Sequence, residues 1–389
     1  TVSQVLEHRW PVVSLQNGAS AARKSLAEHL DWLNGFEQIV LCFDQDEAGR
    51  AAVQSCATLF PPGKLYVVTL PLKDANEMLV QGRVKELVSA LWDAKQYRPD
   101  GIVTVSDLRD RVLNPPKNGL PWCLPSMRAT YGRHFGQCVA LGAGTGIGKT
   151  TFITQQIAFD IAELDQKVGV FALEQSPDET VRRVAGQMVG IPFHVPGEWT
   201  DEQLVEAVDK LQEKEALYLY DHFGACDWSV VRDRIRYLRH AHDVRLFYLD
   251  HLTALAAAAE DERKALEQIM AEVGSLVKEL DIWLLFVSHL ATPDGKPHEE
   301  GGRVMIRHFK GSRAIGYWSH FMIGLERDQQ ADDPSERGTT ILRVLKDRAT
   351  GRSTGLTIPL HYDHATGLFV EGEAEVEPLF NDETEAAPF

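Results

Sequence analysis

A glycine-rich segment near the middle of the chain has the composition of a phosphate-binding loop. Residues 143–150 read Ala-Gly-Thr-Gly-Ile-Gly-Lys-Thr and lie between an apolar, strand-like run and a helical pattern. In such a loop, successive backbone N–H groups surround phosphate oxygens, the lysine reaches the β- and γ-phosphates, and the following hydroxyl binds Mg²⁺. The usual pattern starts with glycine where this chain has alanine, and the alternative interpretation is a glycine turn that binds nothing. We expect nucleotide contacts from Ala143, Gly144, Thr145, Gly146, Ile147, Gly148, Lys149, Thr150 and Thr151.

Three further apolar runs each end in a residue that could act on a bound nucleotide. These residues are Glu174, Asp250 and His289. Because the carboxyl ends of parallel strands share one edge of a sheet, we expect them to gather around the loop. Asp250 would then hold Mg²⁺ with Thr150, Glu174 would activate the attacking water, and His289 would sense the γ-phosphate. Each of them alone could equally be a solvated strand end, and their joint occurrence favours the functional interpretation.

The spacing of the apolar runs predicts which elements position these residues. From residue 121 to about 370, buried-strand patterns alternate with helical ones, and a helix over 151–163 follows the glycine-rich loop. Strands are predicted over 137–141, 167–173, 216–220, 244–249, 281–288, 320–325 and 340–345. This alternation predicts an α/β domain with a parallel sheet flanked by helices.

A smaller α/β pattern comes first in the chain. Strands are predicted over 10–15, 38–43 and 64–70, and helices over 20–33, 47–59 and 83–94. A connector follows, with a short helix that Thr104 and Asp107 would cap and that ends at Asn114. The predicted divisions are an α/β domain, a linker, a larger α/β domain and an acidic disordered tail, at 1–98, 99–120, 121–372 and 373–389.

Length, charge and cysteine content narrow the class of protein. A chain of 389 residues is long enough for two or three domains. Its net charge of −16 argues against a non-specific coat for DNA, although a local cationic cluster could still bind a phosphate backbone. The five cysteines form no C-x-x-C pair, which argues against a zinc ribbon. Apolar stretches are too short to span a bilayer and the chain begins with Thr1, so we expect an intracellular protein cut from a longer one, with no membrane contact.

Several motifs together resemble the bifunctional primase–helicases of podophages. Residues 36–50 read FEQIVLCFDQDEAGR and, with residues 73–77 (KDANE), resemble the Toprim motifs of that family. The glycine-rich loop and the motifs at 173–174, 249–251, 288–290, 298–301 and 325–330 occur in the order of its ring helicase core. The resemblance covers nearly the whole chain and extends, more distantly, to mitochondrial Twinkle and bacterial DnaB.

The resemblance implies a RecA-like P-loop NTPase core, preceded by a partial Toprim domain and a linker helix that packs on the adjacent subunit. It implies a homo-oligomeric ring, a hexamer or heptamer, that uses Mg²⁺ and dTTP or ATP to move 5′→3′ on single-stranded DNA and to unwind forked DNA. Arg348 would be an arginine finger that enters the neighbouring subunit's site, although from the residues alone a solvated arginine is the simpler interpretation. Arg327 and Tyr362 would sandwich the nucleotide base.

Two loops of this core are implied to face DNA in the central channel, at about 290–303 and at 310–313. The side chains and backbone groups available for phosphate contacts there belong to Lys296, Arg303, Lys310, Gly311, Ser312 and Arg313. The first loop has fewer lysines than the family pattern, which predicts a smaller dependence of DNA binding on salt. The alternative is a surface loop with scattered charge.

The resemblance also bears on the two ends of the chain. Asp44 and Asp46 take alternate positions at a predicted strand end and, by resemblance, would bind Mg²⁺ with a glutamate from an earlier strand. We expect that strand and the template-reading zinc region to lie outside this sequence, and therefore expect no primer synthesis. The acidic tail ending in Phe389 would contact the replicative DNA polymerase, or else only aid solubility. The implied location is the cytoplasm of an infected bacterium.

Other functional classes share parts of this pattern. A RecA-type strand-exchange or DNA-packaging ATPase would use the same core without unwinding, but the Toprim motifs and the linker helix argue against it. A Toprim primase or nuclease with an accessory ATPase is disfavoured by the incomplete acid cluster. A purely structural role is disfavoured by the intact set of Lys149, Thr150, Glu174 and Asp250.

Overall fold

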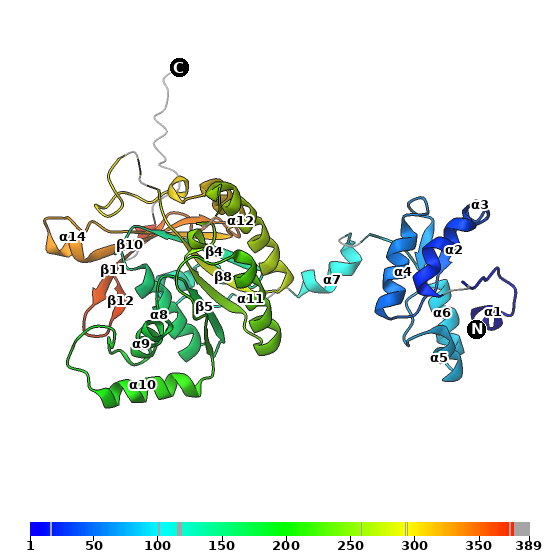
Figure 1. Ribbon diagram of the computed structural model, residues 1–389, viewed down its shortest axis with the longest axis horizontal. Helices are drawn as coiled ribbons and strands as arrows, with labels where there is room; N and C mark the ends of the chain where they lie inside the picture. Colours follow the sequence, from blue (N-terminus) through cyan, green and yellow to red (C-terminus); the bar gives the residue numbers. More distant parts are fainter. Residues whose placement is uncertain are drawn as a thin grey trace, which may run out of the picture. The chain divides into compact units, whose positions relative to one another are not determined.

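The computed structural model describes residues 1–15, 18–99, 102–114, 119–257, 259–291, 293, 295–372 and 375–376. The chain divides into two compact units, Thr1–Pro115 and Pro116–Phe389. Figure 1 shows the elements of each unit, coloured along the sequence. None of the described helices combines the length and the apolar character needed to cross a bilayer.

The first unit is a small α/β structure around a three-stranded sheet. Strands β1 (Ile39–Leu41) and β2 (Leu65–Val67) are parallel, and β3 (Lys95–Gln96) runs antiparallel to β2. Buried apolar residues such as Leu26, Leu41 and Cys56 join the helices to the sheet. The helices are α1 (Val2–Val5), η1 (Ala19–Ala21), α2 (Ala22–Glu28), α3 (Leu30–Leu33), α4 (Glu47–Ala57), α5 (Ala75–Val80) and α6 (Val84–Trp92).

The strand predicted over residues 10–15 is wrong. This segment has no regular secondary structure. Pro11 has no N–H to give to a ladder, and Trp10 and Val13 remain 53% and 62% exposed. An apolar, β-branched composition favours a strand only where a sheet neighbour covers it, and here the composition alone misled the prediction.

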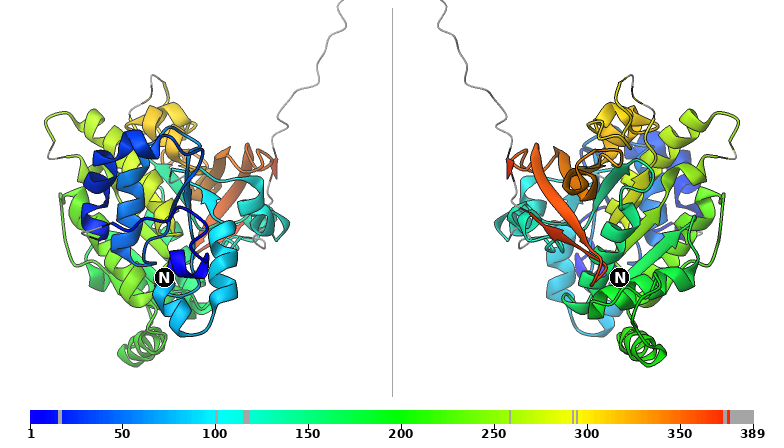
Figure 2. Two further views of the ribbon diagram at one scale, coloured as in Figure 1. Left: turned by 90° about the vertical axis from the view of Figure 1, so that its right-hand side faces the viewer. Right: turned by 90° about the vertical axis from the view of Figure 1, so that its left-hand side faces the viewer.

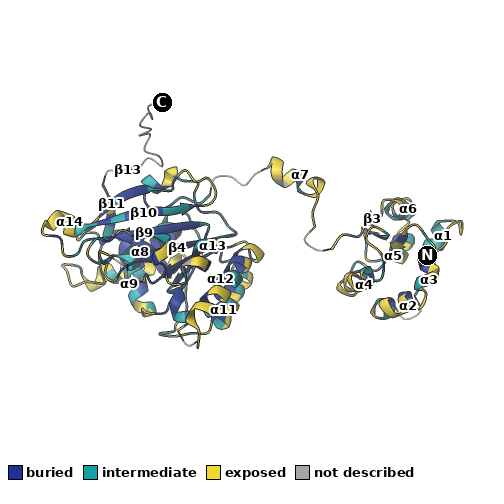
Figure 3. Cartoon of the chain, turned by 90° about the horizontal axis from the view of Figure 1, so that it is seen from above, coloured by how far each residue is buried: buried dark blue, intermediate teal, exposed yellow. Residues whose placement is uncertain are grey.

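The linker helix forms as predicted, as α7 (Val105–Leu113). The Thr104 hydroxyl accepts the Asp107 N–H, and the Asp107 carboxylate accepts the Thr104 N–H at 2.8 Å. The hydrogen bonds that the Thr104 N–H and hydroxyl donate to the Asp107 carboxylate lower its pKa to about 2. Figure 3 shows much of the helix exposed, and the apolar side chains of Val105 and Val112 are 85% and 67% exposed.

The second unit is built on one large sheet in the order β12-β11-β10-β9-β4-β8-β7-β5-β6, with β13 paired to β11. From β9 to β6 the strands are parallel, and β10, β11 and β12 are antiparallel. All seven predicted strands are present. The bounds are β4 (Gln137–Ala143), β5 (Val168–Ala172), β6 (Leu217–Leu219), β7 (Leu246–Asp250), β8 (Trp283–Ser288), β9 (Phe321–Glu326), β10 (Thr339–Asp347), β11 (Leu356–Asp363), β12 (Leu368–Glu371) and β13 (Glu375–Val376).

Strands β11 and β12 were not predicted from the sequence, and they form an antiparallel ribbon coloured orange to red in Figure 2. Part of the tail predicted to be disordered, 373–389, is in fact the short strand β13. The rest of that segment, including Phe389, lies outside the described residues.

Helices cover both faces of the large sheet (Figure 1). Alternate residues of β4 face opposite layers, so Val139 and Leu141 belong to one buried cluster and Cys138 and Ala140 to the other. The first cluster includes α8 (Lys149–Ala162), α9 (Pro177–Val189) and α10 (Asp201–Glu213), and the second α11 (Trp228–His242), α12 (Glu262–Glu279) and α13 (Ser312–Trp318). The remaining short helices are η2 (Ser126–Ala129), η3 (Leu252–Leu255), η4 (Ile306–His308) and α14 (Pro334–Gly338).

A buried ion pair fastens the entry segment of this unit to the sheet. Arg133 donates to the Asp160 carboxylate at 2.8 Å and to the Pro121 carbonyl at 2.7 Å. The Tyr248 hydroxyl donates to the same carboxylate at 2.6 Å. Both charged side chains are fully buried, which makes each dependent on the other.

Candidate nucleotide site

The predicted catalytic residues other than Arg348 lie at one edge of the large sheet. Strands β4, β8, β7 and β5 are neighbours, and their register places their carboxyl ends side by side. The glycine-rich loop follows β4, His289 follows β8, Asp250 ends β7, and Glu174 comes two residues after β5. The structure therefore brings together residues that are up to 146 positions apart in the sequence.

The glycine-rich loop turns directly into α8, whose first residue is Lys149. Gly146 and Gly148 have φ angles of 73° and 103°, in the left-handed region that favours glycine. A Cβ on Gly148 would lie 2.5 Å from the Phe369 ring, so the position excludes a side chain on two grounds. The amino end of α8 thus directs unpaired N–H groups to the point where phosphates would bind.

Asp250 and Thr150, which are predicted to hold Mg²⁺, offer a carboxylate and a hydroxyl oxygen. Burial raises the pKa of Asp250, and the nearby Lys149 ammonium opposes that shift. Burial disfavours the charged form of a carboxyl group, and a nearby cation favours it. Carboxylate and hydroxyl oxygens are also the hard ligands that suit Mg²⁺.

Two histidines approach the carboxylate of Glu174. His251 Nε2 lies 2.9 Å from Glu174 Oε1, and His289 Nε2 lies 3.9 Å from Oε2. The two imidazole rings stack with centroids 3.9 Å apart. Burial, followed by His251 and Lys149, lowers the pKa of His289 to about 4, which keeps it neutral at pH 7. His251 belongs to the motif at 249–251, and the sequence predicted no separate role for it.

A second group that sequence reasoning missed covers the loop itself. The Thr145 N–H donates to Glu299 Oε1 at 3.1 Å, and the Gln329 amide donates to the Thr145 carbonyl at 2.9 Å. Gln329 is in turn bonded through its N–H to the Glu299 carbonyl at 3.0 Å. Glu299 belongs to the segment predicted to face DNA, and its carboxylate takes an amide that a phosphate would use.

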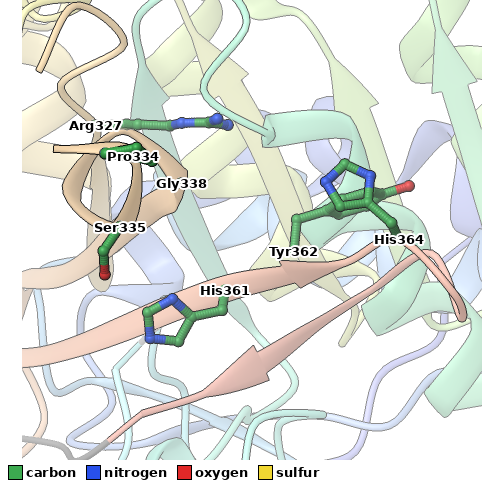
Figure 4. A pocket seen from close by; sticks show the side chains of 7 residues that line it. All are labelled: Arg327, Pro334, Ser335, Gly338, His361, Tyr362 and His364. Carbon is green, nitrogen blue, oxygen red and sulfur yellow. The ribbon is translucent and has the colours of Figure 1, made fainter. Parts of the chain in front are cut away.

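Arg327 and Tyr362, predicted to sandwich the base, line one pocket of about 330 Å³ with Pro334, Ser335, Gly338, His361 and His364. Figure 4 shows the Arg327 guanidinium extended towards the side of the pocket that carries Tyr362 and His364. The Tyr362 and Phe369 rings meet edge-on with their centroids 6.2 Å apart, and Phe369 in turn lies against Gly148. The pocket is therefore connected to the phosphate loop by two aromatic rings.

Arg348 lies at the opposite edge of the sheet. Strand β10 runs antiparallel to β9, which is parallel to β4 and lies between the two, so the end of β10 is level with the start of β4. The Arg348 N–H donates to the His320 carbonyl, and the His320 N–H donates to the Cys138 carbonyl, both at 2.9 Å. The structure thus keeps Arg348 away from the glycine-rich loop of its own chain, with an exposed side chain that donates to the Tyr317 carbonyl at 3.2 Å.

The predicted DNA-contacting residues lie in two places. Lys296 and Arg303 line a pocket of about 390 Å³, but Lys296 is paired with Asp328 at 2.7 Å, which offsets its charge. The Lys310 N–H donates to the His289 carbonyl at 3.0 Å, so the second loop is bonded to the strand end that carries the predicted sensor. Gly311 precedes α13 and Arg313 is exposed, whereas the side chain of Ser312 lies outside the described residues.

In the first unit, the placement of Asp44 and Asp46 on a strand end is wrong. Strand β1 ends at Leu41, so both residues follow it in a loop. Asp46 caps α4 by accepting the Gly49 N–H at 2.9 Å, which explains its position structurally. Among the described residues, no third carboxylate, thiolate or imidazole forms a compact ligand group with these two.

Comparisons with known proteins identify the family. Residues 126–371 match the DnaB-like helicase C terminal domain, and residues 4–79 match a Toprim-like domain. The DNA helicase/primase of Enterobacteria phage T3 is 34% identical over 385 residues, covering 94% of this chain and 67% of that protein. The replicative DNA helicase DnaC of Bacillus subtilis is 21% identical, covering 72% of this chain and 62% of that protein.

Solved structures show the same fold. A DnaB-like replicative helicase, from a structure of that helicase and its interactions with primase, superimposes with a TM-score of 0.57 at 20% identity, over 77% of this chain and 75% of that one. A separately solved ATPase domain gives a TM-score of 0.57 at 21% identity, over 71% of this chain and all of that one. The expected similarity to Twinkle remains a prediction. By its matched domain, its phage relative and the sheet edge described above, the chain belongs to the DnaB-like family of replicative DNA helicases, with a Toprim-like region before the helicase domain.

Proposed function

We propose that this chain forms a ring-shaped helicase that hydrolyses NTP at subunit interfaces, moves 5′→3′ on single-stranded DNA and unwinds forked duplexes. The observation that carries the proposal is the division of the catalytic set between two edges of one sheet. Lys149, Glu174 and Asp250 lie at one edge and Arg348 at the other. A site that needs all four is completed only when a second subunit supplies its arginine, which is the arrangement of a ring.

Within the proposed site, each residue has a distinct task. Lys149 and the loop amides hold the β- and γ-phosphates, and Glu174 takes a proton from the attacking water. Thr150 and Asp250 would hold Mg²⁺, which, when bound, neutralises charge that develops on the phosphates. His289 is neutral at pH 7 and can donate a hydrogen bond to the γ-phosphate without adding charge. Arg348 from the neighbour stabilises the transition state.

The base of the nucleotide is proposed to bind between Arg327 and Tyr362. The pocket between them is connected to Gly148 through Phe369, as a nucleotide spanning base and phosphates requires. Aromatic stacking accepts both thymine and adenine, so dTTP and ATP are both candidate substrates.

Single-stranded DNA is proposed to contact Lys310, Gly311, Ser312 and Arg313, with Lys296 and Arg303 in a weaker role. Support comes from the hydrogen bond between Lys310 and the His289 carbonyl, which joins the DNA loop to the sensor strand. The Lys296–Asp328 pair reduces the charge that the first loop offers to a backbone phosphate. We therefore assign most of the phosphate contacts to the second loop.

The remaining proposals concern the ends of the chain. We infer that this chain does not synthesise primers, because Asp46 is used as a helix cap and no third ligand from the described residues joins Asp44. The exposed apolar side chains of α7 would be covered by the adjacent subunit. By resemblance to the phage primase–helicases, the acidic tail would bind the replicative polymerase and the protein would act in the cytoplasm of a host bacterium.

Hydrolysis of dTTP and ATP, with and without single-stranded DNA, tests the nucleotide site. We expect DNA to stimulate turnover in the wild type and Lys149→Ala to abolish it, because the phosphate charge is then uncompensated. Near-normal turnover in Lys149→Ala would contradict the assignment of the phosphate loop.

A further inference from the structure

His251 is the one member of the Glu174 cluster that has no task in the proposed reaction. Among the described residues, the only set of three or more His, Cys, Asp or Glu side chains placed closely enough to share a metal ion is Glu174, His251 and His289, with ligand atoms within 4.8 Å of one another. Two imidazoles and a carboxylate suit a transition metal. A nitrogen that faces the cluster can bind a metal only with its lone pair, whereas a nitrogen that carries a proton can donate a hydrogen bond to the carboxylate.

The backbone fixes the tautomer of His251. The Ala254 N–H donates to His251 Nδ1 at 3.1 Å, and the Thr253 hydroxyl lies 2.5 Å from the same nitrogen. A nitrogen that accepts a backbone N–H must present its lone pair, and a neutral imidazole carries one proton. That proton is therefore on Nε2, which faces Glu174 Oε1 at 2.9 Å.

This tautomer argues against a metal ion in the cluster. A metal needs the lone pair of Nε2, and His251 could provide it only by placing a proton on Nδ1, against the Ala254 N–H. The same tautomer suits a hydrogen bond from Nε2 to a carboxylate. The cluster is thus built for donation to Glu174.

His251 is also much more firmly held than the residue it contacts. Its side chain is 9% exposed, it caps the short helix η3, and its ring stacks on His289. The Glu174 side chain is 54% exposed and follows the end of β5. A buried, doubly anchored donor can therefore orient an exposed carboxylate.

We propose that His251 is a positioning residue that holds Glu174 Oε1 and leaves Oε2 free to take the proton from the attacking water. The inference rests on the proposed role of Glu174 as the general base. His251 itself touches neither the nucleotide nor the water. Its removal should lower kcat without changing the affinity for nucleotide.

Two variants of His251 separate hydrogen bonding from packing. His251→Phe keeps a ring that can stack on His289 but has no donor, whereas His251→Gln places an amide N–H close to the position of Nε2. We expect kcat for DNA-stimulated dTTP hydrolysis to fall about 10- to 100-fold in His251→Phe, as a fraction of what a general base contributes. We expect His251→Gln to stay within about threefold of wild type, with the Kd for a fluorescent dTTP analogue unchanged in both variants.

The inference is overturned if His251→Phe turns over at the wild-type rate, or if His251→Gln is as slow as His251→Phe. A double-mutant cycle keeps this outcome separate from failure of the proposed function. In a Glu174→Gln background, His251→Phe should cause no further loss, because the carboxylate that it positions is gone. If Glu174→Gln alone hydrolyses dTTP normally, the assignment of the base is wrong. If Glu174→Gln is inactive and His251→Phe is normal, only the positioning role is wrong.

Discussion

Replacing Arg348 with alanine should abolish hydrolysis in a uniform ring, and the loss should be repairable by a second kind of inactive subunit. Through His320, Arg348 is level with Cys138, five residues before the end of β4. At the rise of a parallel strand this is roughly 16 Å before the phosphate loop begins, and the loop lies at the far end. Arg348 cannot serve its own loop across that distance, so the proposed finger role requires the site of a neighbouring subunit.

An arginine finger contributes about 10³–10⁵ in turnover, which corresponds to roughly 4–7 kcal/mol of transition-state stabilisation. We therefore expect Arg348→Ala to lower DNA-stimulated dTTP hydrolysis at least about a thousandfold, with nucleotide binding retained. Arg352→Ala is the matched control, because Arg352 is a similarly exposed arginine four residues away and has no proposed contact with nucleotide.

Mixing Arg348→Ala with Lys149→Ala subunits makes the test specific. Each parent lacks one half of the site, but an interface with the phosphate loop of an Arg348→Ala subunit and the finger of a Lys149→Ala subunit is intact. In a random equimolar mixture about a quarter of the head-to-tail interfaces should be of this kind. Turnover that recovers towards that fraction supports a finger in trans. Mixed rings that form but stay inactive, or an active Arg348→Ala ring, would refute the reasoning.

Three other predictions concern the loop cover, acid stability and the buried ion pair. Glu299→Ala should lower the KM for nucleotide several-fold, because it removes a carboxylate that occupies the Thr145 N–H in place of a phosphate. Glu300→Ala, which removes a neighbouring exposed acid, should leave the KM unchanged. An unchanged KM in Glu299→Ala would contradict competition between Glu299 and phosphate for this N–H. Burial lowers the pKa of His320 to about 4, so between pH 6.5 and 4 the unfolded chain binds a proton that the folded chain does not. The free energy of unfolding should therefore fall as the pH decreases through that range, and His320 should contribute at most about 1.4 kcal/mol per pH unit. Denaturant melts of His320→Asn should show a flatter dependence, and an unaltered slope would exclude this contribution. Arg133→Met should destabilise the second unit by about 3–5 kcal/mol because it leaves the Asp160 charge buried and unpaired, and a thermal midpoint equal to that of the wild type would show that the pair is dispensable.

The core of the helicase unit was predictable because its strands are buried on both faces and therefore read as continuous apolar runs. The phosphate loop was predictable because its backbone takes left-handed φ angles that favour glycine, as at Gly148. Strand β11 was missed because Pro359 stands in its interior, where proline usually argues against a strand, yet β10 pairs along this stretch.

Contacts between distant parts of the chain were beyond the sequence patterns. The bond between Thr145 and Glu299 joins residues 154 positions apart, and the one between His251 and Glu174 depends on how two strand ends meet. Strand ends and motifs predicted which residues gather at one edge of the sheet, but they carry no information on which side chains pair there. The strand wrongly predicted over residues 10–15 shows the same limit from the other side. Its local composition favours a strand, but no described strand of the first unit pairs with it.

The most direct test of the central claim is strand displacement on a forked duplex. The assay compares forks with a free 5′ tail, a free 3′ tail or no tail, with Mg²⁺ and dTTP or ATP, for the wild type and Lys149→Ala. A ring helicase that moves 5′→3′ should separate only forks with a 5′ tail and should lose this activity in Lys149→Ala. Hydrolysis that single-stranded DNA stimulates, without displacement on any fork, would contradict unwinding by this chain and favour a RecA-type DNA-dependent ATPase.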